Sequence, residues 1–366
     1  DATRARHAFA GSIQAAGAVT LCYAAGLFFW SEEALGLLGA EAAVVRVAAP
    51  YLELTVAASL LLSFTMIGES AFRANRDTRT PMWIAIAVTV AKLGLNGILI
   101  FGWLGSPRLE LLGAGLATTI SQALGFSLFV FVVARSDRAM PTGLRPGDLL
   151  RRNPILREVV RIAVPGVAER IVLNLGLMSY FWVLSQYYGT LAVAAYTVGV
   201  SILSFSWIPG TGYAQACSTV VGQALGSGRS EGALHGAQRS LRLAIATAIP
   251  LGLLCAWLRV PLAELFTADA RVVAALSPFM LCLAIAQPFL QLHFTLGGAH
   301  KGAGDTMTPL LAAALGNWGI RVPVALLLGA VLEVRVEWLW ATLIFDHIAR
   351  TALLGASFAR GRWRQV

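Results

Sequence analysis

Ten apolar stretches, each long enough to cross a lipid bilayer as a helix, occupy most of this chain. The hydrocarbon core of a bilayer is about 30 Å thick, and a helix needs roughly 20 apolar residues to span it. By this length criterion the predicted spans are 8–30, 47–72, 81–104, 112–134, 159–186, 190–217, 237–258, 272–299, 309–332 and 338–359. The pattern therefore predicts an all-α polytopic membrane protein.

The composition agrees with a membrane protein and argues against a soluble domain. Hydrophobic residues make up 57% of the chain and charged residues 13%, whereas soluble domains carry roughly 25% charged residues. The net charge of +9 does not indicate nucleic acid, because the basic residues are scattered between the apolar stretches. The four cysteines lie inside apolar stretches without the paired spacing of a zinc or disulfide framework. We expect the bilayer as a partner, no nucleic acid and no metal.

The distribution of Lys and Arg between alternate connections predicts the orientation of the spans. Basic residues accumulate in cytoplasmic loops. One set of connections holds most of them, at Arg4 and Arg6, 73–79, 135–157, Arg229, Lys301 and 360–364. The opposite set holds few, at Arg46, Arg108, Arg259, Arg271 and Arg335. We therefore expect a multi-pass protein of the cell (inner) membrane with both termini in the cytoplasm.

An internal repeat divides the chain into two lobes. Residues 72–81 recur as residues 300–309, with Asp77 matched to Asp305 at an offset of 228 residues. The same offset also pairs Pro50 with Pro278, Ala71 with Ala299 and Leu99 with Leu327. Both copies place their basic end on the same predicted side, so the repeats are parallel. The predicted division is an N-terminal lobe at 1–135, a basic linker at 136–157 and a C-terminal lobe at 158–366.

The repeat also predicts two absent helices. The second lobe opens near Pro154 with two helices before the stretch at Arg229. At the repeat offset, the first lobe would need roughly 75 more residues before residue 1 to match these two helices. We therefore expect a complete protein of twelve helices in two lobes of six. This chain would correspond to helices 3–12.

Several motifs resemble those of the multidrug and toxic compound extrusion (MATE) family. The loop 301–309 resembles the family's R-G-x-G-D-T-x-T-P, and 221–229 resembles V-G-Q-x-L-G-A-G-R. The openings 164–166 and 318–323 are similar to those of the first and fifth helices of the second lobe. The first copy of the loop is a looser match, with Ala74 and Arg76 where the family favours Gly.

The resemblance implies a function and a mechanism. Members of the family are secondary active multidrug efflux transporters, with two six-helix lobes that alternate access to a central cavity. We therefore expect antiport of H⁺ or Na⁺ against small amphipathic, cationic organic substrates. The resemblance further implies a monomer that is not an enzyme and that needs no cofactor beyond the coupling ion.

Glu169 is the best candidate for cation coupling. An ionisable side chain within the bilayer costs about 2.5 to 3.5 kcal/mol, so each one is a functional candidate. Glu169 follows Pro165 by four residues, which places it about 10 Å deep in its helix. Family members often carry a functional Glu in this helix. The alternative is a structural acid held by Arg170 or by the helix dipole.

The remaining candidates for the cation-coupling site or substrate cavity are polar residues within other spans. They are Gln287, Gln291, His293, Asn96, Asn317 and Asp346. Gln291 is an amide where some family members bear an acid, and the resemblance places a polar residue near Asn96. Asp346 and Arg350 lie one helical turn apart and are expected to form an ion pair. Arg321 would serve as a fixed counter-charge, and His293 and His347 either handle protons or form structural hydrogen bonds.

Four other function classes are less consistent with the sequence. A flippase of lipid-linked oligosaccharides or precursors, in the same superfamily, would carry several cavity arginines, and Arg170, Arg321 and Arg350 are few. A membrane-embedded enzyme would need a catalytic constellation, but H-E-x-x-H and G-x-S-x-G are both missing. A passive channel would not need paired, kinked lobes. A nucleotide-driven pump would need a G-x-x-x-x-G-K-[ST] motif, which is absent.

Overall fold

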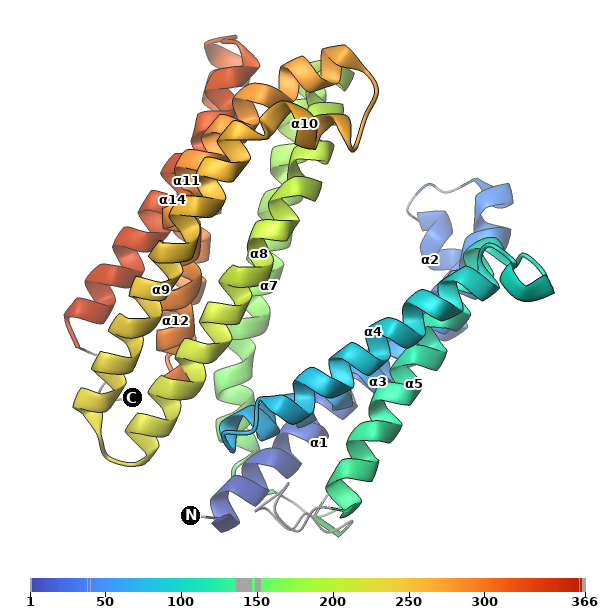
Figure 1. Ribbon diagram of the computed structural model, residues 1–366, viewed down its shortest axis with the longest axis vertical. Helices are drawn as coiled ribbons and strands as arrows, with labels where there is room; N and C mark the ends of the chain where they lie inside the picture. The colour runs from blue at the N-terminus through green and yellow to red at the C-terminus, as the bar shows by residue number, and fades with distance from the viewer. Residues whose placement is uncertain are drawn as a thin grey trace. The chain divides into compact units, whose positions relative to one another are not determined.

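The computed structural model describes residues 2–37, 39, 41–135, 147–148, 153–361 and 363, and all regular elements in these residues are helices. The chain forms two compact units, Asp1–Val160 and Arg161–Val366 (Figure 1). Most of the predicted linker 136–157 lies outside the described residues. The lobe boundaries given by the sequence stay a prediction.

In the first unit, α3 is the central one of four long helices. Its helices are α1 (Ala2–Phe29), α2 (Ser31–Leu37), α3 (Ala42–Ala74), α4 (Arg79–Leu99) and α5 (Glu110–Arg135), with the short turn η1 (Trp103–Gly105) between the last two. Helix α3 packs against α1 and α5, and α4 packs against α5. A small apolar core forms where Phe72 contacts Phe129 edge-to-face at 5.5 Å.

In the second unit, α11 is the central helix and packs against α8, α9 and α14. The helices are α7 (Leu156–Tyr187), α8 (Gly189–Gly226), α9 (Ser230–Trp257), α10 (Arg259–Glu264), α11 (Ala270–Gly302), α12 (Met307–Ala314), η2 (Leu315–Arg321), α13 (Val322–Leu326), η3 (Leu327–Val331) and α14 (Val336–Ala359). Aromatic rings fill the core between α8, α11 and α14. There Tyr196 stacks on Trp340 at 6.0 Å, and Phe279 meets Trp340 edge-on at 5.3 Å.

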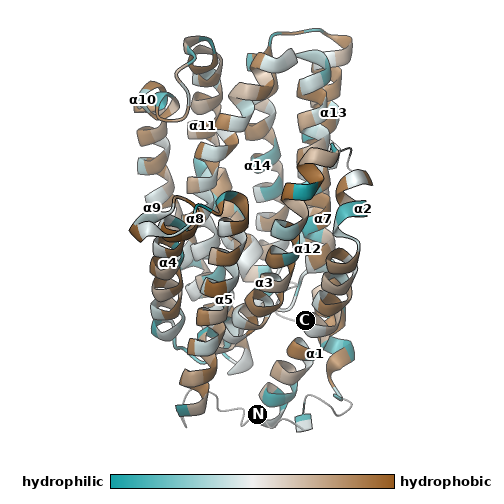
Figure 2. Cartoon of the chain, turned by 90° about the vertical axis from the view of Figure 1, so that its right-hand side faces the viewer, coloured by the Kyte–Doolittle hydropathy of each residue, from teal (hydrophilic) through white to brown (hydrophobic). Residues whose placement is uncertain are grey.

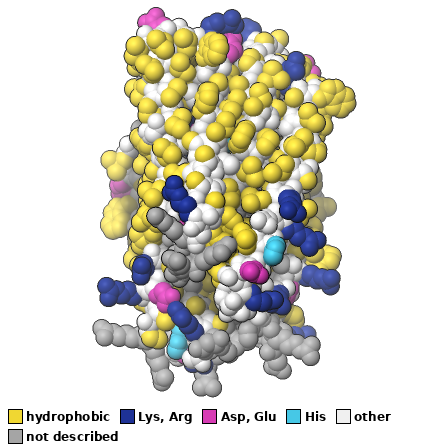
Figure 3. All heavy atoms as spheres, turned by 90° about the vertical axis from the view of Figure 1, so that its left-hand side faces the viewer, with side chains coloured by type: hydrophobic (Ala, Val, Ile, Leu, Met, Phe, Trp, Pro, Cys, Tyr) yellow, Lys and Arg dark blue, Asp and Glu magenta, His cyan; other side chains and the backbone are white. Residues whose placement is uncertain are grey.

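Within the described residues, nine helical stretches are long and apolar enough to cross a membrane. Hydrophobic residues run along the length of these helices (Figure 2). A broad apolar band is visible on the face shown in Figure 3, with Lys and Arg side chains gathered below it and at its upper rim. The tenth predicted span corresponds to α14, whose buried Asp346, His347 and Arg350 lower its hydropathy. These side chains face the interior of the unit, so the all-α membrane fold expected from the sequence is confirmed.

The helix boundaries follow the repeat. Adding 228 residues to the bounds of α1 gives those of α9, and the same shift converts α3 into α11. The start of α4 at Arg79 likewise corresponds to Met307, although the helical stretch of the second unit continues to Val331. Two helix pairs with identical bounds at one offset mean that the two units are built from the same supersecondary pattern.

The repeated loop is capped in the same way in both copies. Asp77 accepts hydrogen bonds from the backbone nitrogen and the hydroxyl of Thr80, at 3.0 and 2.6 Å, and Asp305 accepts the equivalent two from Thr308 at the same distances. Burial opposes ionisation of both carboxyls, but these hydrogen bonds outweigh it and lower their pKa values. The expected loop-shaping role of the two aspartates therefore has a structural basis.

The two copies of the loop differ at one strained position. Gly304 has φ +86° in the second copy, and Arg76, its counterpart, has φ 66° in the first. This left-handed conformation costs a non-glycine residue roughly 1–2 kcal/mol. The strain at Arg76 corresponds to the position where the first copy departs from the family pattern.

Replacing Arg76 with Gly should therefore raise the free energy of unfolding of the first unit by about 1 kcal/mol. Gly304→Ala should lower that of the second unit by a similar amount. Chemical denaturation in mild detergent measures both changes. A stability that is unchanged or lowered in Arg76→Gly would show that the arginine makes contacts that offset its strained backbone.

Candidate functional site

The fifth helix of the second unit is wound differently from its counterpart in the first. Helix α4 is α-helical throughout, whereas residues 315–321 and 327–331 form the π-helical segments η2 and η3. π-Helical turns are rare and frequently occur at functional sites. Segment η2 contains two of the polar residues, Asn317 and Arg321, and both are buried.

Asp346 and Arg350 on α14 form a buried ion pair. The Asp346 carboxylate accepts from Nε of Arg350 at 2.5 Å and from Nη2 at 2.8 Å. Arg350 Nη2 also donates to Oδ1 of Asn317 at 2.9 Å. The pairing expected from the one-turn spacing is therefore present, and it joins α14 to η2.

Arg321 extends this pair into a network of three charged groups. Its Nη1 lies 3.8 Å from Oδ2 of Asp346, and its Nη2 donates to the hydroxyl of Tyr196 at 3.1 Å. The guanidinium lies over the ring of Tyr180, 4.4 Å from the centroid, which is a favourable cation–π arrangement. Arg321 thus connects η2 to α7, α8 and α14, and we call Asn317, Arg321, Asp346 and Arg350 the charge network.

Two histidines lie beside the charge network. The rings of His293 on α11 and His347 on α14 are stacked 4.9 Å apart at 18°. Nδ1 of His293 lies 3.2 Å from the carbonyl oxygen of Phe289. Within the part of the chain that the structure describes, neither ring nitrogen of the buried His347 has a hydrogen-bond partner. Both predicted histidines therefore meet at one place.

Gln287 and Gln291 share a partner that the sequence analysis missed. Both side chains are fully buried. The amide nitrogen of Gln287 donates to the hydroxyl of Ser206 at 2.6 Å, and that of Gln291 donates to the Ser206 carbonyl oxygen at 2.9 Å. Ser206 is an uncharged residue inside an apolar stretch, so nothing in the sequence marks it as a site residue. Only the folded structure brings it to Gln287, which is 81 residues away in the chain.

Glu169 pairs with a residue outside the charge network, and Asn96 belongs to the other unit. Oε1 of Glu169 on α7 accepts a hydrogen bond from Nζ of Lys301 at 3.0 Å, and Oε2 lies 2.8 Å from the same nitrogen in an ion pair. The partner of Glu169 is therefore Lys301 and not the neighbouring Arg170. Lys301 is the first residue of the repeated loop 301–309. Asn96 belongs to α4 of the first unit and is half-buried. The functional roles predicted for all seven candidate residues stay predictions.

The first unit has no equivalent of the charge network. At the repeat offset, the four network positions correspond to Thr89, Leu93, Thr118 and Gln122. None of these is charged. The two units therefore share a backbone pattern but differ in the polarity of their interiors, and the charged interior belongs to the second unit.

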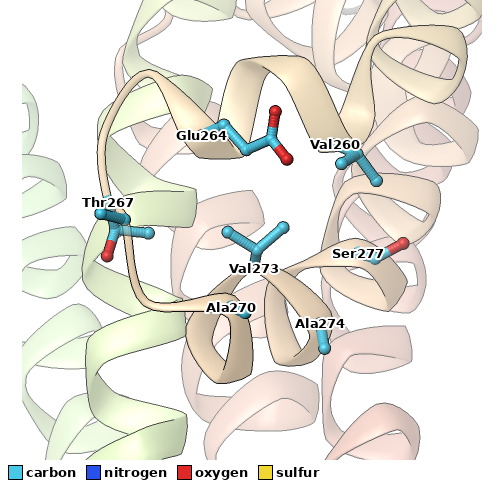
Figure 4. Close-up of a pocket in the computed structure, with 8 residues that line it drawn as sticks. Val260, Glu264, Thr267, Ala270, Val273, Ala274 and Ser277 are labelled. Atoms are coloured by element: carbon cyan, nitrogen blue, oxygen red, sulfur yellow. The ribbon is translucent and has the colours of Figure 1, made fainter.

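A separate pocket lies at the N-terminal end of α11. It has a volume of about 670 Å³ and lies between α10 and the first turns of α11. Val260, Glu264, Val273 and Ser277 are among its lining residues (Figure 4). None of the lining residues is a predicted site residue, so the pocket does not add to the candidate site.

Comparison with known families decides the identity of this arrangement. The model of the MatE family matches residues 1–98 and 165–327, which together make up more than half of the chain. The chain belongs to the MATE transporter family. The predicted resemblance is therefore confirmed, and the family is one of membrane transporters and not of enzymes.

Curated relatives of this MATE chain carry names that refer to drug resistance. A probable multidrug resistance protein NorM of Thermotoga maritima is 26% identical over 325 residues, which cover 89% of this chain and 69% of the relative. A protein of the same name from Rhodopseudomonas palustris is 28% identical over 337 residues, covering 90% and 70%.

Solved structures agree with the MATE fold. The Vibrio cholerae MATE transporter VcmN in its bent form matches with a TM-score of 0.83 at 20% identity, covering all of this chain and 83% of that one. The eukaryotic MATE transporter AtDTX14 matches with a TM-score of 0.84 at 19% identity, covering 98% and 79%. At these identities the likeness concerns the fold.

Gly316 provides a test of how tightly the charge network is packed. A Cβ at this position would meet Oδ1 of Asp346 and Nε of Arg350. Gly316→Ala should therefore break the ion pair and lower the free energy of unfolding by about 3 kcal/mol, as measured by chemical denaturation in detergent.

Gly297→Ala is the matched control, because a Cβ at Gly297 meets no atom within 4 Å. Stability in this variant should stay level or rise by about 1 kcal/mol, since Ala is the better helix former. Equal stability of the two variants would contradict the tight packing of the network.

Proposed function

We propose that this MATE chain exports small amphipathic, cationic organic molecules by antiport with H⁺ or Na⁺, through alternating access between its two lobes. The observation that carries the proposal is the family match over residues 1–98 and 165–327. The printed names of the relatives, probable multidrug resistance proteins, support the substrate class. We further propose a monomer in the cell (inner) membrane with both termini cytoplasmic.

Glu169 is the residue that we propose for cation coupling. Its side chain is 13% exposed and that of Lys301 is 38% exposed, so the protein does not enclose the pair completely. A proton or Na⁺ taken up by the carboxylate would compete with the lysine ammonium for the same oxygens. Loss of this ion pair would free Lys301 and weaken the connection between α7 and the repeated loop.

A second contact between the same elements supports this role. The hydroxyl of Thr306 donates to the carbonyl oxygen of Ile162 at 2.9 Å. The loop after α11 is therefore held against the beginning of α7 by one neutral hydrogen bond and one ion pair. Only the ion pair depends on the charge of Glu169, so cation binding would change the strength of this attachment.

Asp346 has a different role in this proposal. Its carboxylate is held between the guanidinium groups of Arg350 and Arg321. We therefore propose that Asp346 maintains the charge network. Gln287, Gln291, His293 and Asn317 are proposed to give the interior of the second lobe its polar character, and Asn96 is proposed to do so in the first lobe.

The energy available from coupling is sufficient for export. Moving a compound against a hundredfold gradient needs about 2.8 kcal/mol, and a cationic substrate also has to move against the membrane potential. One cation moving down 100 mV supplies about 2.3 kcal/mol before its own concentration gradient is counted. One or two coupling ions per substrate are therefore enough.

The flippase alternative receives little support from the arginines. Arg321 and Arg350 are both engaged with Asp346, and a pyrophosphate group would have to compete with that carboxylate. Arg170 is exposed, but it is a single arginine, and its neighbour in the sequence is the acidic Glu169. Efflux of cationic compounds is the function that we adopt.

Transport by reconstituted vesicles tests the proposal. A fluorescent cationic dye should leave vesicles that contain the purified protein when a pH or Na⁺ gradient is imposed. Glu169→Gln should remove most of this gradient-driven efflux, because a neutral amide cannot exchange the coupling cation as the carboxylate does.

Glu337→Gln is the matched control, because Glu337 is also paired with a basic residue, Arg335 at 2.8 Å, but on an exposed surface. Its rate should equal that of the unchanged protein. Dye efflux that survives Glu169→Gln would assign coupling to another residue. Absence of efflux under both gradients would contradict the proposed function itself.

A further inference from the structure

A basic groove lies along one face of α9, away from the charge network. Its volume is about 540 Å³, and its lining residues are His235, Gln238, Arg239, Arg242 and Leu243. The spacing of three, four and seven residues places these side chains on one side of the helix. All five are exposed. We call this surface the α9 groove.

The two arginines of the α9 groove have no acidic partner. Within the described residues, neither guanidinium makes a hydrogen bond or an ion pair. Arginines at the other end of the unit differ, since Arg271 pairs with Asp269 at 3.0 Å and Arg335 with Glu337 at 2.8 Å. The α9 groove therefore carries two positive charges that no carboxylate among the described residues compensates.

An exposed apolar surface begins directly beside the basic residues. Leu243, Leu253 and Trp257 follow them along α9, with 52%, 67% and 79% of their surfaces exposed. From Arg242 to Trp257 the helix rises about 22 Å, which is a large part of the thickness of a hydrocarbon core. Tryptophan is enriched at membrane interfaces, so Arg242 and Trp257 would mark the two edges of the apolar region.

We propose that the α9 groove binds the phosphate group of an anionic phospholipid, with the acyl chains lying along Leu243, Leu253 and Trp257. Two guanidinium groups match the geometry of phosphate oxygens, and Gln238 adds an amide donor. Basic residues next to a membrane attract anionic lipids of the cytoplasmic leaflet. This is also the side on which the Lys and Arg bias of the sequence places the start of α9.

The apolar surface distinguishes a phospholipid from free phosphate. Free phosphate would contact only the polar residues of the α9 groove and would gain nothing from the leucines and the tryptophan. An anionic lipid satisfies both parts at once. Its negative charge also accounts for the presence of two arginines where a zwitterionic headgroup would need fewer.

Native mass spectrometry of the purified full chain tests the proposal, with phosphatidylglycerol and phosphatidylcholine of identical acyl chains as probes. Each basic residue near the lipid surface contributes roughly a fivefold preference for an anionic lipid. The unchanged protein should therefore retain phosphatidylglycerol about 25-fold better than phosphatidylcholine at low salt. The preference should fall as salt screens the exposed charges.

Three variants separate the charge of the α9 groove from folding and from total charge. Arg239→Gln with Arg242→Gln should remove most of the preference, and Arg239→Lys with Arg242→Lys should keep most of it. Arg271→Gln with Arg335→Gln makes the same change in net charge at the other end of the unit and should have no effect.

Several results would overturn the proposal. One is an unchanged lipid preference after loss of both groove arginines, and another is an equal fall in the control pair. A third is the absence of any preference in the unchanged protein. Displacement of phosphatidylglycerol by millimolar inorganic phosphate would assign the groove to free phosphate instead.

Discussion

The carboxylate of Asp346 lies in the apolar interior of the second unit, with the guanidinium groups of Arg350 and Arg321 around it. Charges in such surroundings are costly unless they are paired and hydrogen-bonded. Asn317, Tyr196 and the ring of Tyr180 supply the remaining contacts. The elements that carry these groups, α7, α8, η2 and α14, must therefore keep one arrangement. Gly316 has no side chain, and this leaves room for the ion pair between Asp346 and Arg350.

The repeat shows how two lobes can share a backbone and differ in chemistry. The bounds of α1 and α3 agree with those of α9 and α11 at an offset of 228 residues, and Asp77 and Asp305 cap equivalent loops. Yet the charge network occurs in the second unit alone, on a fifth helix that contains π-helical turns. At the position of Arg321 in the second lobe, α4 of the first lobe has Leu93.

Periodicity, length and spacing were enough to predict the helices, the repeat and the Asp346–Arg350 pair, because all three depend on local or regular features of the sequence. The contact between Glu169 and Lys301 spans 132 residues and was missed for that reason. Ser206 and the two tyrosines beside Arg321 were missed because an uncharged side chain in an apolar stretch carries no signal. The π-helical turns also left no mark, since residues 309–332 read as one continuous span.

A double-mutant cycle on Asp346 and Arg350 tests most directly whether the charge network organises the second unit. The free energies of unfolding of Asp346→Asn, Arg350→Gln and the double variant would be measured in detergent. We predict a loss of about 3–5 kcal/mol in each single variant, because each leaves a buried group without its partner. The double variant should lose less than the sum, with a coupling energy of at least about 2 kcal/mol. Additive losses below about 1 kcal/mol each would contradict the account.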